Sequence, residues 1–307
     1  MSVPAIHIES LTKIYSGDLG KKPIRAVENL DLDIHQGEVF AFLGANGAGK
    51  TTTLKCMMRL LFPTQGKIEI FNVSNQSPKA MMPVGFMPEQ PHIYGYLTGR
   101  EFLFLIAKLF KLKKHEQKQR VEICLDQVGL STKADQLVRG YSRGMMQRLG
   151  LAQALINNPS LLILDEPMSN LDPIGRKEFR DLILSLKDQG KTLFFSSHIL
   201  SDAELIADRV GILNQGKLIN TGKLKDLIQS QTNVIEITFI LPAEKLIDLG
   251  CEEQQMIQQD EKTLIRFENE EKMQPVLEKI FKMNGQIISI IPQKRSLEDI
   301  FMTEVGG

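Results

Sequence analysis

The sequence shows no excess of charge of either sign. Its 307 residues include 37 lysines and arginines and 37 aspartates and glutamates. A nucleic acid or an acidic surface is attracted by a positive field, so this balance excludes binding driven by the charge of the whole chain. We therefore expect no nucleic-acid partner.

Cysteine is scarce and unpatterned. Cys56, Cys124 and Cys251 are odd in number, far apart and without CxxC or Cys/His spacing. This pattern argues against both a disulfide framework and a zinc site. A reducing compartment is expected.

Long hydrophobic segments are also missing. The longest apolar runs, such as FLFLIA at 102–107, fall far short of the roughly 18 residues that span a bilayer. We expect that the chain does not cross a membrane by itself. The start, MSVPAIHIES, has neither a basic segment nor an apolar core, so no secretory signal is expected and the cytoplasm is the expected location.

Short strand-like runs alternate with helical patterns over the first two thirds of the chain. The runs occupy 5–9, 39–43, 161–164, 193–196 and 209–213. This alternation indicates an α/β fold with a mostly parallel, buried sheet. Between Thr98 and Asn158 helix follows helix, beginning with a capping box in which Glu101 follows Thr98 by three residues. An inserted helical subdomain at about 97–158 is predicted.

The pattern changes again after about Gly222. A linker-like helix, KLKDLIQSQ, leads to the runs NVIEITFI and KTLIRF, a helix at about 271–283 and the run QIISII. We predict a first domain at 1–228 and a small accessory α/β domain at 229–307. Because a domain of this size is marginally stable alone, we expect it to lean on a partner surface.

The strand at 39–43 runs into a glycine-rich loop. Residues 44–51, GANGAGKT, match G-x-x-x-x-G-K-[ST] and are followed by a helical pattern that stops at Pro63. Glycines let the loop turn tightly, so that its N–H groups and the helix N-terminus face phosphate oxygens. The alternative is a chance match in an unrelated turn. The nucleotide-binding residues predicted in the loop are Gly44, Asn46, Gly47, Ala48 and Gly49.

The residues after these glycines carry the predicted chemistry. Lys50 is expected to reach the β- and γ-phosphates of ATP, and the Thr51 hydroxyl to ligate Mg²⁺. Thr52 is expected to assist from the next position.

Two carboxylates follow the strand at 161–164. Asp165 stands at its carboxyl end, where parallel sheets bind ligands, and is predicted to hold Mg²⁺. Glu166 is the predicted base for the attacking water. The alternative is a solvated acidic turn. Asp172 and Pro173 are suited to start the next helix as its cap and first residue.

These residues resemble the ATP-binding subunit of ABC transporters from about residue 5 to the C-terminus. The resemblance implies a P-loop NTPase ABC ATPase core: a RecA-like sheet, an N-terminal antiparallel β subdomain and an inserted helical subdomain. In that family an aromatic residue stacks on adenine, and Tyr15 stands at the matching place. The alternative is that Tyr15 only packs against its neighbours and has no role in nucleotide binding.

Two further positions, Gln90 and His198, take their roles from the resemblance. Gln90, in MPEQP, matches the family's glutamine loop, with a catalytic role and contact to Mg²⁺ implied; Glu89 is the alternative, and the amide of Gln90, which both donates and accepts, favours Gln90. His198 matches the switch histidine that contacts the γ-phosphate. The alternative for Gln90 is a polar loop residue without a catalytic role, and the alternative for His198 is a structural histidine.

The segment YSRGMMQ is similar to the family signature, usually LSGGQ. Ser142 and Gly144 match and are predicted to bind the γ-phosphate at a helix start. Tyr141, Arg143 and Met145 depart from the common form. At Met145 the glutamine that is usual in the signature is absent, so this position lacks an amide for contact with phosphate.

The family's signature completes the phosphate site of another subunit. The resemblance therefore implies a head-to-tail homodimer with ATP at the interface, and a separate transmembrane permease that holds the chain at the inner face of the cell membrane. The C-terminal module is similar to that of ABC-2-type exporter subunits, so export is favoured over import.

Two other functions stay open. One is a soluble ABC protein that remodels a ribosome or a nucleic acid, although such proteins usually carry two cassettes or a coiled-coil insertion. The other is an ATP-binding regulator whose altered signature does not support turnover.

Overall fold

A computed structural model describes residues 3–16, 22–229, 234–246, 249, 256–259, 262–267, 270–293 and 297–305. The chain forms two compact units, Met1–Leu224 and Lys225–Gly307. Their division falls within helix α8 (Leu224–Gln229), close to the domain boundary predicted after residue 228.

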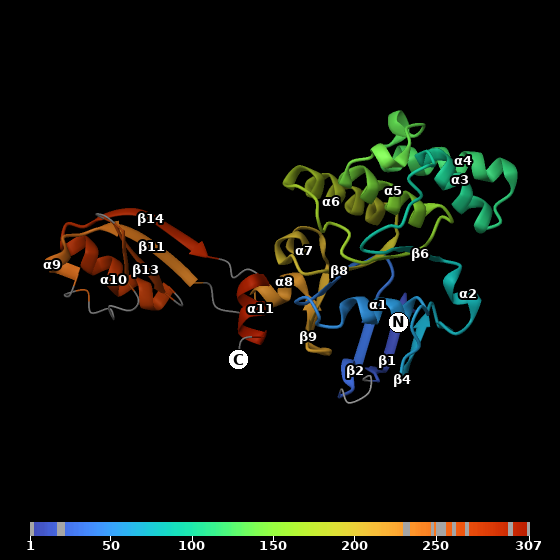
Figure 1. Cartoon of the computed structure of the whole chain (residues 1–307). Coiled ribbons are helices and arrows are strands. Elements are labelled where there is room, and N and C mark those ends of the chain that lie inside the picture. Colours follow the sequence, from blue (N-terminus) through green and yellow to red (C-terminus); the bar gives the residue numbers. More distant parts are fainter. Residues whose placement is uncertain are drawn as a thin grey trace. The chain divides into compact units, whose positions relative to one another are not determined.

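The first unit contains two sheets (Figure 1). The antiparallel sheet has the order β2-β1-β4-β5, with β1 (Ile6–Tyr15), β2 (Ile24–Ile34), β4 (Gln65–Ile70) and β5 (Val73–Ser74). The six-stranded sheet has the order β10-β9-β3-β8-β7-β6, with β3 (Val39–Leu43), β6 (Val84–Met87), β7 (Leu161–Leu164), β8 (Thr192–Ser197), β9 (Arg209–Asn214) and β10 (Lys217–Lys223). Its neighbours from β9 to β6 pair in parallel, and β10 pairs antiparallel with β9. The predicted mostly parallel sheet is confirmed.

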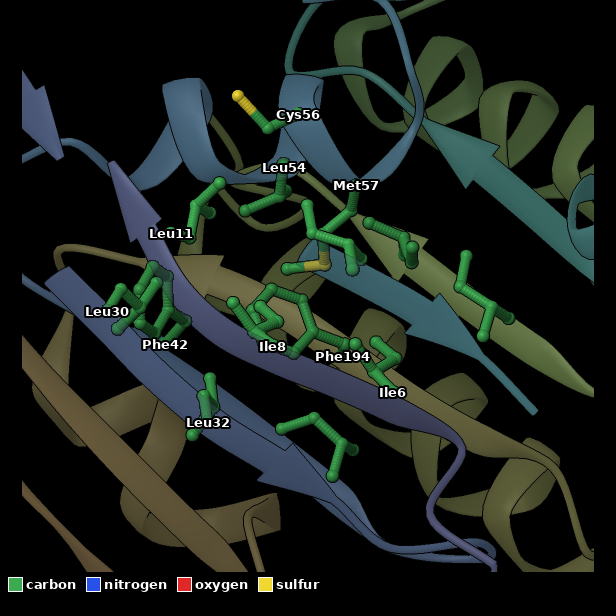
Figure 2. Packing of buried hydrophobic residues seen from close by; sticks show 14 of the residues in the cluster. Ile6, Ile8, Leu11, Leu30, Leu32, Phe42, Leu54, Cys56, Met57 and Phe194 are labelled. Carbon is green, nitrogen blue, oxygen red and sulfur yellow. The ribbon is translucent and has the colours of Figure 1, made fainter. Parts of the chain in front are cut away.

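Apolar side chains join the two sheets and α1 in one core (Figure 2). Phe40 and Phe42 of β3 point to the same side of their strand, and Phe194 of β8 lies against both, with ring centroids 5.7 and 5.5 Å away. All three are fully buried. Since burial of one such side chain stabilises by about 1.5–3 kcal/mol, this core fixes β3 and β8, the two central strands of the site described below.

The helices of the first unit are α1 (Lys50–Met57), α2 (Pro78–Met81), α3 (Gly99–Leu109), α4 (Lys114–Gln127), α5 (Arg143–Leu155), α6 (Pro173–Asp188) and α7 (Leu200–Ile206). They include those predicted after the phosphate loop, within 98–158 and after Asp172, and two that the sequence patterns do not predict, α2 and α7. Helices α3 to α5 lie together between β6 and β7 in the chain, with one-turn 3₁₀ helices at Ser131–Lys133 and Val138–Gly140 (Figure 1).

Two predicted helix starts are present. Thr98 and Glu101 form the capping box of α3: the Glu101 N–H donates to the Thr98 hydroxyl at 3.2 Å, and the Thr98 N–H donates to the Glu101 carboxylate at 2.9 Å. Asp172 caps α6 by accepting from the Gly175 N–H at 2.8 Å, and Pro173 is the first residue of that helix.

The second unit is a four-stranded antiparallel sheet with helices. Its strands, in the order β12-β13-β11-β14, are β11 (Val234–Ile240), β12 (Met256–Gln259), β13 (Lys262–Phe267) and β14 (Gln286–Gln293). Its helices are α9 (Ala243–Leu246), α10 (Glu270–Lys282) and α11 (Leu297–Val305). Ile237, Phe239, Ile265 and Ile280 are fully buried in its own small core. The predicted strands and α10 are present, whereas the sequence patterns do not predict β12 and α11.

Candidate nucleotide site

Four neighbouring parallel strands end at one edge of the six-stranded sheet. The segments that follow β3, β6, β7 and β8 all contribute to a cavity of about 590 Å³ at that edge. The cavity is lined by Ala26, Ala45, Asn46, Gly47, Gly49, Lys50, Thr51, Thr52, Glu89, Glu166, Ser169, Asn170, Arg176, His198 and Ile199. Most of the predicted site residues are therefore brought together.

The glycine-rich loop follows β3 and leads into α1. Gly49 caps α1 in the left-handed region, with φ +108°, and a side chain there would overlap the Ala26 carbonyl oxygen. A Cβ at Gly44 would lie 2.5 Å from the Leu213 carbonyl oxygen. Both positions therefore require glycine: Gly44 because of the close approach, and Gly49 because of the close approach and its left-handed backbone angle. Gly44 and Ala48 shape the loop without lining the cavity.

Lys50 is buried at the start of α1, with 5% of its surface exposed. Its Nζ donates to the carbonyl oxygens of Gly44 at 2.7 Å and Ala45 at 3.2 Å. It also lies 3.2 Å from Oε1 of Glu166. The lysine charge is thus held by the loop at the floor of the cavity, where a phosphate group would meet it.

Asp165 is buried immediately after β7, with 3% of its surface exposed. Its Oδ1 accepts from the Ser196 hydroxyl at 2.7 Å and from the Thr51 hydroxyl at 3.2 Å. Burial raises the pKa of Asp165 above its ordinary value and the Glu166 carboxylate adds to the rise, against the opposing effect of the two hydroxyls and of Lys50. A buried carboxylate whose charge is costly gains from a nearby cation.

These oxygens fit magnesium. Mg²⁺ prefers oxygen ligands and is usually held by one or two carboxylates together with substrate phosphates. Thr51 and Asp165 present a hydroxyl and a carboxylate in mutual contact beside the phosphate loop. Among the described residues there is no cluster of three or more His, Cys, Asp or Glu side chains that could hold a metal without such a substrate.

Glu166 has a left-handed backbone, with φ +46°. Its Oε2 is 2.8 Å from Nδ1 of His198, and the His198 N–H donates to the same oxygen at 3.4 Å. Together with the Lys50 contact, these partners hold the carboxylate in the cavity wall. This places a potential base beside the lysine that would bind phosphate.

Tyr15 lies at the end of β1, with 38% of its surface exposed. Its hydroxyl is 3.5 Å from the Thr52 hydroxyl, and Lys13 Nζ is 5.4 Å from the ring centroid. The tyrosine is thus next to the phosphate loop without lining the cavity. Its exposed surface leaves the ring accessible to a flat partner.

In the loop after β6, the cavity is lined by Glu89, and Gln90 does not line it. Both residues are exposed. The Glu89 carbonyl oxygen accepts from Nε2 of Gln147, on α5, at 3.4 Å. The structure therefore brings the alternative residue, Glu89, to the other site residues.

Ser142 lies at a different cavity, of about 920 Å³. It caps α5 by accepting from the Met145 N–H at 3.2 Å. Gly144, Met145, Leu171 and Asp172 share this second cavity with it. Within one chain, Ser142 and Lys50 thus line separate cavities, and Asn170 lines both.

Sequence reasoning missed Ser196 and Arg176. Ser196 bonds to Asp165 and to the Glu166 N–H, and Arg176 of α6 lines the first cavity. The available signal for Ser196 was a polar residue at the end of the buried run Leu193, Phe194 and Phe195. Arg176 carried no signal besides its place in the first turn of α6.

The loop, the buried lysine and the paired carboxylates define a phosphate-loop nucleotide-binding protein. A family model described as ABC transporter matches residues 27–169. The chain is 39% identical to an ABC transporter ATP-binding protein of Nostoc sp., over 99% of this chain and 91% of the relative. It is 38% identical to the bacitracin transport ATP-binding protein BcrA of Bacillus licheniformis, over 98% and 97%.

Solved structures agree. A dimeric ATP-binding cassette, MJ0796, in a post-hydrolysis state bound to ADP and Pi has a TM-score of 0.65 at 28% identity, over 71% of this chain and 98% of that one. CbiO1 of Clostridium perfringens, part of the ABC transporter complex cbiONQ, has a TM-score of 0.65 at 27% identity, over 74% and 91%. The chain therefore belongs to the ATP-binding proteins of ABC transporters, and the predicted fold class is confirmed. In the described part of the chain, no helix has the length and apolar character of a membrane span.

The raised pKa of Asp165 predicts how its charge affects stability. A raised pKa in the folded chain contributes stability that is fully present below the ordinary value and is lost as the pH rises through the raised one. At pH 7, Asp165→Asn removes a buried charge and should raise the melting temperature of the nucleotide-free chain. Because the variant also lacks a carboxylate for Mg²⁺, Mg-ATP should raise its melting temperature less than that of the wild type.

Asp202→Asn is the matched control. Asp202 is equally buried at 3% exposure but pairs with Arg180 at 2.6 Å, so its loss should lower the melting temperature. Scanning calorimetry of both variants gives the comparison. A lower melting temperature for nucleotide-free Asp165→Asn would contradict the prediction.

Proposed function

We propose that the chain binds and hydrolyses Mg-ATP, and that two copies working together drive a separate transmembrane permease in export. The observation that carries the proposal is the contact of the Glu166 carboxylate with both Lys50 and His198 in the cavity wall. This contact supports the roles proposed for Glu166 as the base, for Lys50 as the cation that binds phosphate and for His198 as a second contact to the γ-phosphate.

The site residues divide the reaction among them. Lys50 and the N–H groups of the glycine-rich loop would bind the phosphates, and Thr51 and Asp165 would hold Mg²⁺, whose charge offsets that of the phosphate oxygens. Glu166 would orient and deprotonate the attacking water, and His198 would contact the γ-phosphate. Tyr15 would stack on adenine, with its hydroxyl beside Thr52.

The separate cavities of Lys50 and Ser142 support pairing. A signature serine that does not line the phosphate-loop cavity of its own chain can serve that of another copy. Ser142 of the partner subunit and Gly144 of the partner subunit would then contact the γ-phosphate across a head-to-tail, twofold interface. The dimeric state of the MJ0796 cassette agrees with this arrangement.

Helix α5 offers a route from the signature to the permease. Ser142 caps this helix, and Gln147 of the same helix holds the Glu89 carbonyl oxygen. The loop that continues from Gln90 exposes Tyr94 and Tyr96, whose ring centroids are 5.5 Å apart. Exposed paired aromatics of this kind suit contact with a permease.

The remaining parts of the proposal follow from the relatives. Similarity along nearly the whole chain to BcrA, which is named as a bacitracin transport ATP-binding protein, supports a role in transport. We propose export because the C-terminal module is similar to that of ABC-2-type exporter subunits, and a place at the inner face of the membrane, held there by the permease. We propose 1–228 as the ATP-binding domain and 229–307 as an accessory domain. The alternative of a regulator without turnover rests on Met145, which replaces an amide side chain; steady phosphate release by the purified chain would exclude it.

Two variants should separate the binding of phosphate by Lys50 from the activation of water by Glu166. Lys50→Ala should lose nucleotide binding, because its ammonium would contact the phosphates. Glu166→Gln should keep ATP binding but lower hydrolysis by about 10²–10⁴-fold, the usual contribution of a positioned base. Light scattering should show it as an ATP-dependent dimer. Unchanged phosphate release by Glu166→Gln would remove that residue from the assigned role.

Shared sites predict complementation between inactive chains. Lys50→Ala and Ser142→Arg each remove a different half of the composite site, so a mixed dimer retains one intact site. Random pairing should restore about one quarter of the wild-type ATPase activity, since half of the dimers are mixed and each has one site of two. The control mixture of Lys50→Ala with Glu166→Gln damages the same half and should restore none. Equal activity in both mixtures would argue against sharing.

Neighbouring variants separate the two residues of the loop after β6. Glu89 lines the cavity and is the candidate for contact with Mg²⁺ and water, whereas we propose Gln90, which does not line it, for contact with the permease. Glu89→Ala should therefore lower the ATPase rate of the isolated chain about tenfold, the equivalent of one lost polar contact. Gln90→Ala should retain that rate and lose stimulation by the permease. The reverse pattern would assign the cavity role to Gln90.

A further inference from the structure

Ser196 connects the carboxylate of Asp165 with the backbone of Glu166. It is the fifth residue of β8, which lies between β3 and β7 in the sheet, and it is fully buried. The last paired residues of β7 and β8 are Leu164 and Phe195. Ser196 therefore stands beside Asp165, at the point where β7 leaves the ladder and the chain turns into the cavity.

The hydrogen bonds of Ser196 have one possible direction. The Glu166 N–H lies 2.8 Å from the Ser196 oxygen and can only donate to it. The single hydroxyl proton of Ser196 is therefore free for the Asp165 Oδ1, at 2.7 Å. One side chain thus accepts from the backbone of the candidate base and donates to the candidate metal ligand.

The hydrogen bond from the Glu166 N–H to Ser196 helps to hold the strained backbone of Glu166 in place. Glu166 has φ +46°, a left-handed conformation that costs a non-glycine residue about 1–3 kcal/mol and persists where its surroundings fix it. The Glu166 carboxylate is held by Lys50 and His198, and its N–H is held by Ser196. The turn that aims Glu166 into the cavity is therefore fixed at both the side chain and the backbone.

The second bond orients Asp165. With Ser196 and Thr51 both donating to Oδ1, the rotation of the carboxylate is fixed. Among the described residues, Oδ2 has no hydrogen-bond partner, so this oxygen remains available as a ligand. The Ser196 hydroxyl would thus orient the metal ligand through a hydrogen bond without binding the metal itself, as partners of metal ligands commonly do.

We propose that Ser196 is a positioning residue for the hydrolysis of ATP, which ties the orientation of the metal ligand Asp165 to that of the base Glu166. Neither the Asp165 carboxylate nor the Glu166 backbone can then change its orientation without loss of a bond to the same hydroxyl. This inference rests on the proposed function, since it assigns Ser196 to the Mg-ATP site described above. Ser196 itself does not line the cavity.

The test compares two buried hydroxyls of one strand. Ser196→Ala removes the bridging hydroxyl with little change of volume. Thr192→Val is the matched control, because Thr192 also lies on β8, is 2% exposed and accepts a backbone N–H, that of Gly37, at 2.9 Å. Its hydroxyl stands at the opposite end of the strand from the cavity. Both variants should melt below the wild type.

The full-length variants would be titrated with Mg²⁺ at fixed ATP, with melting temperature and phosphate release as readouts. In Ser196→Ala, the Mg²⁺ concentration for half of the ATP-induced rise in melting temperature should increase about tenfold, and kcat should fall at least as much, as expected for a lost bond to a charged group. Binding of ATP without Mg²⁺ should stay within about twofold, because the phosphate loop is intact. Thr192→Val should keep the wild-type Mg²⁺ requirement.

A conservative variant completes the design. Ser196→Thr keeps a hydroxyl and should recover most of the Mg²⁺ requirement and kcat. If Ser196→Ala does not fold, Ser196→Cys, with its weak donor, should show the same defects in smaller measure. An unchanged Mg²⁺ requirement and kcat in the alanine or cysteine variant would overturn the positioning role. Absence of Mg-ATP binding in the wild type would instead overturn the proposed function.

Discussion

The parallel alignment of β6, β7, β8 and β3 is the constraint on which the site depends. Because these neighbouring strands run in the same direction, their carboxyl ends meet at one edge, and the segments that follow them converge. Residues more than a hundred positions apart, such as Lys50 and Glu166, are brought to 3.2 Å in this way. The apolar core around Phe40, Phe42 and Phe194 fixes the alignment, so packing beneath the cavity lining helps to determine its geometry.

The cost of the arrangement is the burial of charge. Lys50, Asp165 and Glu166 are all less than a tenth exposed, and such groups are stable in a protein interior when they have partners. Lys50 and Glu166 partly neutralise each other, whereas Asp165 is supported by hydroxyls and keeps a raised pKa. The site is thus held in a form that favours a bound cation and a bound anion together, as a nucleotide with its metal provides.

Residues in continuous patterns could be predicted from the sequence, and residues that depend on tertiary direction could not. The strands at 39–43 and 161–164 match in full because buried parallel strands read as unbroken apolar runs. The glycine-rich loop, Asp165 and Glu166 follow from their places after those strands. Glu89 and Gln90 are adjacent, so only the path of the loop decides which one faces the cavity. Ser196 looks like any strand-end serine until β7 is placed beside β8.

Asn170 borders both cavities of the chain, in the short segment between Glu166 and the cap of α6. Any shift of this segment on filling of one cavity alters the wall of the other. Thermodynamic linkage makes such an influence mutual. If occupancy of the first cavity changes the free energy of binding in the second, occupancy of the second changes binding in the first by the same amount. In a twofold pair, a segment of this kind would connect the nucleotide cavity of each chain with the surface that its neighbour's nucleotide contacts.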